Sequence, residues 1–200
     1  MSLTTLVTKE APDFTAQAVM PDNAFAELTL SRYRGKYVIL FFYPLDFTFV
    51  CPSEILAFDK KVAAFKEKNC EVIGVSVDSR FTHLAWKNTA VENGGIGNIQ
   101  YPLVEDLNKA IARSYGILLN DSVALRGLFL IDTKGNIRHA VINDLPLGRS
   151  VNEALRMLDA LQFVETHGDQ VCPANWQEGE ESMKPTAAGV AEYLAKKHGK

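Results

Sequence analysis

The 200-residue chain lacks the features that would tie it to nucleic acid or to a membrane. Its formal charge is 21 − 24 = −3 with histidine neutral, so it has no basic field to attract polyanions. The longest unbroken apolar run, residues 37–43, is seven residues long, whereas a membrane-spanning helix needs about 20. The N-terminus has neither the basic start nor the apolar stretch of a secretory signal. We therefore expect a soluble, cytoplasmic protein that binds neither nucleic acid nor membrane.

Cysteine is also scarce, since the chain contains only Cys51, Cys70 and Cys172. Three cysteines are too few for a scaffold held together by disulfides. No pair has the spacing of metal ligands and none forms a C-x-x-C motif, so the sequence predicts no metal site and no cofactor. Two interpretations remain for each cysteine: a buried structural thiol, or a thiol kept for its reactivity.

Apolar residues make up 47% of the chain, enough to fill the core of one domain. Strand and helix periodicities alternate from residue 37 onward. The pattern predicts strands over 37–43 and 71–78, then a hairpin formed by GLFLID and IRHAVIND. It predicts helices between and after these strands, over residues 51–68, 81–93 and 107–114 and from Ser150 onward.

This order of elements predicts an α/β protein with a mixed central sheet flanked by helices, which is the order of the thioredoxin-like fold. The composition changes after Gly168, where aliphatic residues become rare and proline, glycine and glutamate accumulate. We therefore expect a thioredoxin-like domain over residues 1–168 and an extended C-terminal arm over 169–200. The end of the arm, VAEYLAKKHGK, is typical of a short terminal helix.

The segment PLDFTFVCP, residues 44–52, places a cysteine where a strand gives way to a helix. Pro52 is tolerated in the first helical turn, so Cys51 lies at the positive end of the helix, which favours a thiolate. Thr48 offers a hydroxyl three residues earlier, and Pro44 and Pro52 stiffen the loop. A thiolate with donors but no histidine base suits attack on a weak bond such as the O–O bond of a hydroperoxide. The alternative is a cysteine that only packs at the start of a helix.

The same segment resembles the peroxidatic loop of the typical two-cysteine peroxiredoxins, the branch that includes alkyl hydroperoxide reductase C. The resemblance extends over nearly the whole chain, through an ordered series of motifs. These motifs are APDF (11–14), FYPLDFTFVCPSE (42–54), FTHLAWKNT (81–89), RGLFLID (126–132), DLPLGRSV (144–151) and VCPANW (171–176).

The resemblance assigns roles to individual residues. It implies that Cys51 is the peroxidatic cysteine, that Thr48 holds the peroxide and that Pro44 shields the site. It implies that Arg126 pairs with the thiolate and with a substrate oxygen, as a permanently charged guanidinium can. Glu54 and Arg149 match the outer pair that orients this arginine.

The resemblance also implies a resolving cysteine, Cys172 in VCPANW, which forms a disulfide with Cys51 of another subunit. It therefore implies a homodimer, and decamers of five dimers are common in that family. Since the chain has no C-x-x-C motif, the reductant is expected to be a separate protein, either thioredoxin-like or a flavoprotein.

The expected function is thus a thiol-dependent peroxidase acting on hydrogen peroxide and organic hydroperoxides. One alternative is a ring-forming holdase chaperone of the same fold, whose cysteines act only as switches. A one-cysteine peroxidase is a second alternative, although VCPANW argues against it. We expect structural roles for Cys70 and Trp86 and a packing or surface role for His83.

Overall fold

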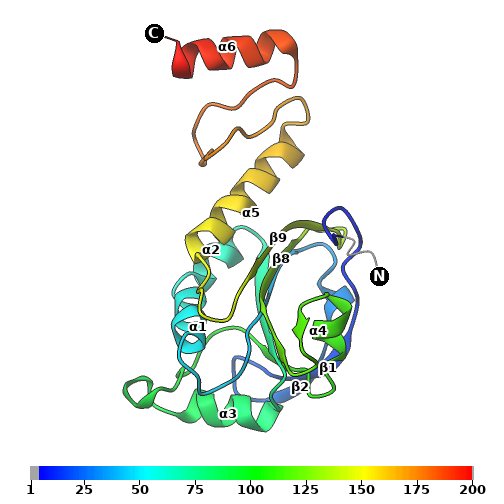
Figure 1. The fold of residues 1–200 in the computed structure, drawn as a ribbon, viewed down its shortest axis with the longest axis vertical. Coiled ribbons are helices and arrows are strands. Elements are labelled where there is room, and N and C mark those ends of the chain that lie inside the picture. The colour runs from blue at the N-terminus through cyan, green and yellow to red at the C-terminus, as the bar shows by residue number, and fades with distance from the viewer. Residues whose placement is uncertain (1–4, 200) are drawn as a thin grey trace. The chain divides into compact units, whose positions relative to one another are not determined.

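The computed structural model describes residues 5–199 and contains a seven-stranded mixed sheet in the order β2-β1-β5-β4-β3-β8-β9 (Figure 1). β3, β4 and β5 run parallel, and the remaining pairings are antiparallel. The mixed sheet and its flanking helices confirm the predicted thioredoxin-like class. The strands are β1 Thr15–Val19, β2 Phe25–Thr29, β3 Tyr37–Phe42, β4 Cys70–Ser76, β5 Leu103–Glu105, β8 Arg126–Ile131 and β9 Ile137–Asn143.

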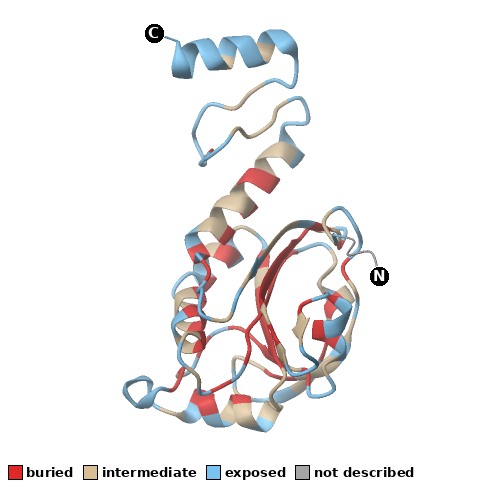
Figure 2. Ribbon diagram, in the orientation of Figure 1, coloured by how far each residue is buried: buried red, intermediate tan, exposed pale blue. Residues whose placement is uncertain are grey.

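Alternate side chains of β3 explain why both faces of the sheet are covered. Val38, Leu40 and Phe42 face one side, where they join a core cluster that includes residues of α4, Ala110–Ser114. Phe41 faces the other side and stacks on Phe58 of α1, Cys51–Asp59, with ring centroids 4.5 Å apart. Figure 2 shows the buried residues concentrated along these strands.

Several predicted helices are shorter than their periodicity suggested. The helix expected over 51–68 is divided at Lys60 and Lys61 into α1 and α2, Val62–Glu67, and this break leaves Val62 and Phe65 buried. The helix expected over 81–93 ends early as α3, Arg80–Asn88, because Thr89 is extended. The helix expected over 107–114 begins only at Ala110, since Lys109 has a left-handed backbone with φ of 61°.

The sequence patterns also missed β1, β2 and β5, which are short strands on one side of the sheet; β2 forms its edge, and β1 lies between β2 and β5. Shorter elements complete this part of the chain. They are β6 Leu118–Leu119, β7 Val123–Ala124 and the 3-10 helices Leu30–Tyr33 and Val91–Asn93.

The chain divides into two compact units, the first ending at Val151 and the second beginning at Asn152. The second unit contains almost all of α5, Val151–Thr166, together with α6, Ala187–His198. This division lies before the predicted boundary at 168/169, because α5 makes contacts with the segment that follows the helix. Phe163 of α5 packs on Trp176 with ring centroids 4.8 Å apart, and Arg156 donates to the Trp176 carbonyl at 2.7 Å.

Candidate active site

Cys51 is the first residue of α1 and its side chain is fully buried. β3 ends at Phe42, and residues 43–50 bring the chain to the start of this helix. Pro52 occupies the first helical turn as predicted, where its missing N–H costs no hydrogen bond. The sulfur therefore lies at the positive end of the helix and is shielded from bulk water.

Two polar groups from different parts of the chain contact the Cys51 sulfur. The Thr48 hydroxyl oxygen lies 3.0 Å from Sγ and 2.8 Å from the Leu45 carbonyl oxygen. Because a hydroxyl carries one hydrogen, Thr48 donates to only one of these acceptors at a time. Arg126, the first residue of β8, places Nη1 3.4 Å from Sγ. The structure thus brings together the three residues that the sequence analysis placed at the reacting centre.

Glu54 holds Arg126 in place from the next turn of α1. Its Oε2 accepts from Arg126 Nη1 at 2.7 Å, while the Leu145 carbonyl accepts from Arg126 Nε at 2.7 Å. Arg126 Nη1 therefore contacts the Glu54 carboxylate and the Cys51 sulfur at the same time. The side chain of Arg126 is 4% exposed and that of Glu54 is 2% exposed, so little water screens this contact.

Arg149 binds the same carboxylate through three further hydrogen bonds. Its backbone N and its Nε both donate to Glu54 Oε1 at 2.7 Å, and its Nη2 donates to Oε2 at 2.9 Å. Its Nη1 donates to the Phe42 carbonyl at 2.8 Å and also to the carbonyl of Gly127. Burial alone raises the pKa of Glu54, but the hydrogen bonds and charge of Arg149, with the charge of Arg126, outweigh it and lower that pKa. Glu54 is therefore a fixed anion between two cations.

A cavity of about 480 Å³ opens beside Thr48 and Arg126. Its wall is mostly apolar, and Pro44, itself buried, forms part of it. Val123, Leu145 and Pro146 were not predicted from the sequence, because they come from distant segments and carry no chemical signal of their own. The full lining is Pro44, Leu45, Thr48, Phe49, Val50, Val123, Arg126, Leu145 and Pro146.

Cys172 belongs to the C-terminal unit and has quite different surroundings. Its thiol is partly exposed and faces the Ala160 carbonyl oxygen of α5 at 3.7 Å, a weak sulfur contact. Burial raises the pKa of this thiol, and the Arg156 guanidinium opposes that rise. Cys51, Cys70 and Cys172 are all free thiols in this structure. Cys70, in β4, is buried, and burial raises its pKa far above the ordinary value.

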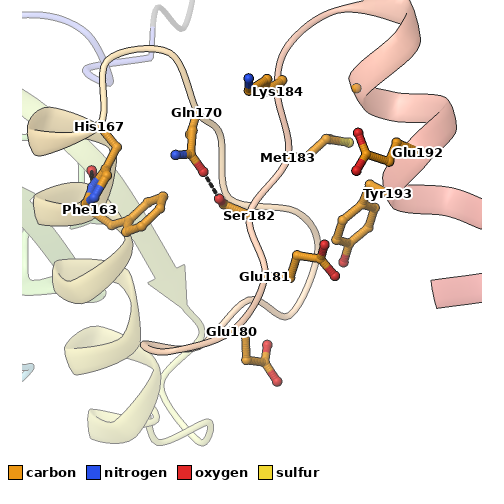
Figure 3. A pocket seen from close by; sticks show the side chains of 11 residues that line it. Phe163, His167, Gln170, Glu180, Glu181, Ser182, Met183, Lys184, Glu192 and Tyr193 are labelled. Carbon is orange, nitrogen blue, oxygen red and sulfur yellow. Dashed lines mark hydrogen bonds between the residues drawn. The ribbon is translucent and has the colours of Figure 1, made fainter. Parts of the chain in front are cut away.

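The C-terminal unit contains a second cavity, of about 360 Å³ (Figure 3). Phe163 of α5 and His167, which directly follows that helix, border it on one side and Glu192 and Tyr193 of α6 on the other, and Ser182 donates to Gln170 beside it. None of the residues predicted to be catalytic lines this cavity.

Within residues 5–199, no three His, Cys, Asp or Glu side chains gather in an arrangement that could hold a metal ion. No helix in the same range is long and apolar enough to cross a membrane.

Two family models match the chain. The AhpC/TSA family matches residues 7–140, and the C-terminal domain of 1-Cys peroxiredoxin matches residues 160–196. Peroxiredoxin-1 of Gekko japonicus is 57% identical over 189 residues, which are 94% of each protein. Alkyl hydroperoxide reductase C of Helicobacter pylori strain J99 is 59% identical over 191 residues, covering 94% of this chain and 96% of the relative.

Solved structures give the same result. The reduced 2-Cys peroxiredoxin of Plasmodium vivax superposes with a TM-score of 0.94 at 55% identity, covering 96% of this chain and 100% of that one. AhpC of Enterococcus faecalis superposes with a TM-score of 0.78 at 38% identity, covering 85% of this chain and 100% of that one. The chain therefore belongs to the AhpC/TSA family and is a peroxiredoxin, a thiol-dependent peroxidase.

Proposed function

We propose that Cys51 is the thiol that reduces the hydroperoxide. The observation that carries this proposal is the buried sulfur with Thr48 Oγ1 at 3.0 Å and Arg126 Nη1 at 3.4 Å. The Cys51 thiolate attacks the distal peroxide oxygen and the O–O bond breaks. The sulfur gains OH and becomes a sulfenic acid, while the alkoxide or hydroxide that leaves takes a proton from water. Sulfur is oxidised by two electrons and the peroxide is reduced by two.

The surrounding groups suit this step. The Arg126 guanidinium faces the sulfur, and its permanent positive charge stabilises the negative charge that develops on the leaving oxygen. The Thr48 hydroxyl holds the peroxide next to the sulfur. Glu54 and Arg149 keep the Arg126 guanidinium in this orientation, and Pro44 excludes water. The apolar wall of the cavity suits the small alkyl group of an organic hydroperoxide, while Thr48 and Arg126 offer polar contacts to its O–O group and to hydrogen peroxide.

Cys172 is proposed to resolve the sulfenic acid. Its thiol condenses with the Cys51 sulfenic acid, so that an S–S bond forms and one water leaves. A disulfide needs the two Cα atoms within about 7 Å. We propose that the cysteines come from two subunits and that an external dithiol protein, thioredoxin-like or a flavoprotein, reduces the disulfide by exchange.

We propose a homodimer that can assemble further, for example into a decamer. An exposed aromatic cluster on the first unit supports an interface. Phe25 and Phe81 meet edge to face with ring centroids 5.3 Å apart, and the Arg80 guanidinium lies 4.9 Å from the Phe81 centroid. Exposed apolar groups that adjoin one another often mark an interaction surface. A related structure, of Plasmodium yoelii Prx1a modified at its N-terminus, is titled an artifactual octamer.

Two further predictions concern a chaperone activity and the cellular location. The relatives named above are peroxiredoxins and a hydroperoxide reductase, so the holdase chaperone stays a prediction without a specific observation in its favour. A cytoplasmic location also stays a prediction, and one structural relative, from Plasmodium falciparum, is titled mitochondrial.

Electrophoresis without reductant, after treatment with one equivalent of hydrogen peroxide, tests this reaction scheme. The wild type and the Cys70→Ser variant should migrate as covalent dimers, and Cys172→Ser and Cys51→Ser should migrate as monomers. Cys70→Ser is the matched control, because it removes a buried thiol outside the site. A covalent dimer of Cys172→Ser would refute its resolving role. A disulfide that leaves the wild type monomeric would refute pairing between subunits while leaving the peroxidase chemistry intact.

A further inference from the structure

The loop that carries Thr48 is attached to the protein interior by a buried polar cluster of Tyr43, Asp46 and His83. Asp46 Oδ1 accepts from the Tyr43 hydroxyl at 2.8 Å, and Asp46 Oδ2 lies 2.7 Å from His83 Nδ1. The side chains of Asp46 and His83 are both 0% exposed. His83 was expected to have only a packing or surface role, whereas the structure buries it against a carboxylate.

The hydrogen bonds of His83 fix the position of a proton in this cluster. Its Nε2 lies 3.2 Å from the Val104 carbonyl oxygen, which can only accept, so Nε2 carries a hydrogen. The contact between His83 Nδ1 and Asp46 then requires one more proton between them. Burial raises the pKa of Asp46, and the hydrogen bond and charge of His83 oppose that rise. A buried pair of this kind is costly to break, because the partner left behind has no replacement.

The backbone of Asp46 is fixed as well as its side chain. Its amide N donates to Asp78 Oδ2 at 2.8 Å, and the same oxygen accepts from the Ser76 hydroxyl at 2.8 Å. The residue that follows, Phe47, has φ of 53°, a left-handed conformation that is strained for a bulky side chain. A strained conformation persists only where the surrounding structure fixes it. Asp46, the residue before Phe47, is fixed by the hydrogen bonds of its side chain and of its backbone amide.

Thr48 follows Phe47 directly, so its place depends on this strained turn. Its hydroxyl is within hydrogen-bonding distance of both the Leu45 carbonyl and the Cys51 sulfur. A loop that relaxed at Phe47 would move the hydroxyl away from the sulfur. A displacement of about 1 Å in a reacting geometry can cost roughly a hundredfold in rate.

We propose that Asp46 and His83 are positioning residues that hold the strained turn at Phe47 and so place the Thr48 hydroxyl against Cys51. The inference rests on the proposed roles of Cys51 and Thr48. Neither Asp46 nor His83 touches the sulfur; each acts through the loop.

Lys87 provides a matched control on the same helix. It lies one turn after His83 in α3, is 4% exposed, and donates from Nζ to the Met20 carbonyl at 2.8 Å and to that of Pro21 at 3.3 Å. It therefore attaches α3 to the turn between β1 and β2. A Lys87→Met variant disturbs a buried polar anchor of α3 without touching the loop.

The experiment measures the rate of Cys51 oxidation by hydrogen peroxide in proteins that all carry Cys172→Ser, by rapid quenching, alkylation and mass spectrometry. His83→Leu should be about ten- to a hundredfold slower than the parent, and Lys87→Met should stay within about twofold of it. His83→Asn keeps a donor near the Nδ1 position and should regain most of the lost rate. A merely structural role predicts the reverse order for the two His83 variants, since Asn fills the buried site less well than Leu.

A double-mutant cycle with Thr48→Val tests whether His83 acts through Thr48. His83→Leu should slow the Thr48→Val protein by less than about twofold, because the group that His83 positions is already absent. Equal slowing in both backgrounds, or His83→Leu as fast as Lys87→Met, would overturn the inference. If His83→Leu does not fold, Tyr43→Phe, which removes only the hydroxyl that donates to Asp46, takes its place in the same cycle.

These outcomes separate the inference from the proposed function. If the parent protein consumed no more peroxide than Cys51→Ser, the proposed function itself would be wrong. If the parent is active and the cycle is additive, only the positioning role is wrong.

Discussion

Cys51 and Cys172 are held in opposite ways. Cys51 is fully buried, and a guanidinium and a hydroxyl contact its sulfur. Cys172 is partly exposed, and its thiol makes one weak contact with the Ala160 carbonyl. A thiol that attacks a small peroxide gains from fixed surroundings, because its partners are then already in place. A thiol that must reach a second sulfur gains from weak attachment, because little is lost when it moves.

The ion pairs near Cys51 are buried, whereas the ion pair near Cys172 is partly exposed. Glu54 is 2% exposed and receives hydrogen bonds from two arginines. Arg156, near Cys172, pairs with Glu153, and their side chains are 25% and 44% exposed. Breaking a buried pair typically costs about 3–5 kcal/mol, whereas an exposed pair contributes about 0–1 kcal/mol. Substitutions around Cys51 should therefore have much larger effects than substitutions around Cys172.

The sharpest contrast comes from removing each sulfur. Cys51→Ser should abolish peroxide consumption, because no other thiol has these surroundings. Cys172→Ser should keep the first oxidation at the wild-type rate and lose only turnover with a dithiol protein. Stopped-flow measurement of one turnover and steady-state assays with a thioredoxin system distinguish the two steps. Loss of the first oxidation in Cys172→Ser would contradict the division of roles.

Arg126→Leu should slow the oxidation of Cys51 by about 10²–10³-fold, because the donor that stabilises developing charge is lost. Arg113→Leu is a suitable control, since Arg113 is 61% exposed and pairs with Asp121 on the surface. Peroxide consumption under pseudo-first-order conditions measures both rates. Equal rates for Arg126→Leu and the wild type would remove Arg126 from the mechanism.

Glu54→Gln should lower the free energy of unfolding near neutral pH by about 3–5 kcal/mol, because two buried arginines lose their anion. Since folding lowers the pKa of Glu54, its contribution is complete above the ordinary value of 4.5 and is lost as the pH falls through the lower, folded-state pKa. The difference between wild type and variant should therefore shrink in acid.

Urea unfolding at neutral and acidic pH measures this difference. Glu71→Gln serves as the control, because Glu71 pairs with Lys36 at the surface and should change stability by at most about 1 kcal/mol. A difference that grows as the pH falls would contradict the lowered pKa of Glu54.

The smallest effect is expected around Cys172. Arg156→Gln removes the hydrogen bond to the Trp176 carbonyl and the pair with Glu153. Amide hydrogen exchange over residues 171–177 should become faster by no more than about fivefold, as expected for a partly exposed pair worth less than about 1 kcal/mol. Peroxide oxidation of Cys51 should be unchanged. A much larger effect on exchange would mean that this segment is held as firmly as the Cys51 loop.

The sequence predicted the parts of the site that are local. Pro44, Thr48 and Cys51 lie in one segment between a strand and a helix, so turn chemistry and the helix terminus identify them directly. Arg126 and Arg149 are 72 and 95 residues from Glu54 in the chain, and only the resemblance to a family connected them. Long-range contacts of this kind leave no periodic trace in the sequence.

Asp46 and His83 show what local patterns miss. The two residues are 37 positions apart, and a single histidine on an amphipathic helix resembles a packing residue. One signal was available: His83, Trp86 and Lys87 lie on one face of α3, and two polar residues beside a tryptophan on a buried face need buried partners. β1, β2 and β5 were missed because strands of three to five residues are too short to show a clear alternation.

The most direct test of the account is the rate at which hydrogen peroxide oxidises Cys51 in the Cys172→Ser variant, compared with free cysteine at the same pH. A rate about a thousandfold higher or more is expected, since Arg126 and Thr48 already contact the buried Cys51 sulfur. A rate equal to that of free cysteine would contradict the claim that these contacts activate the Cys51 sulfur.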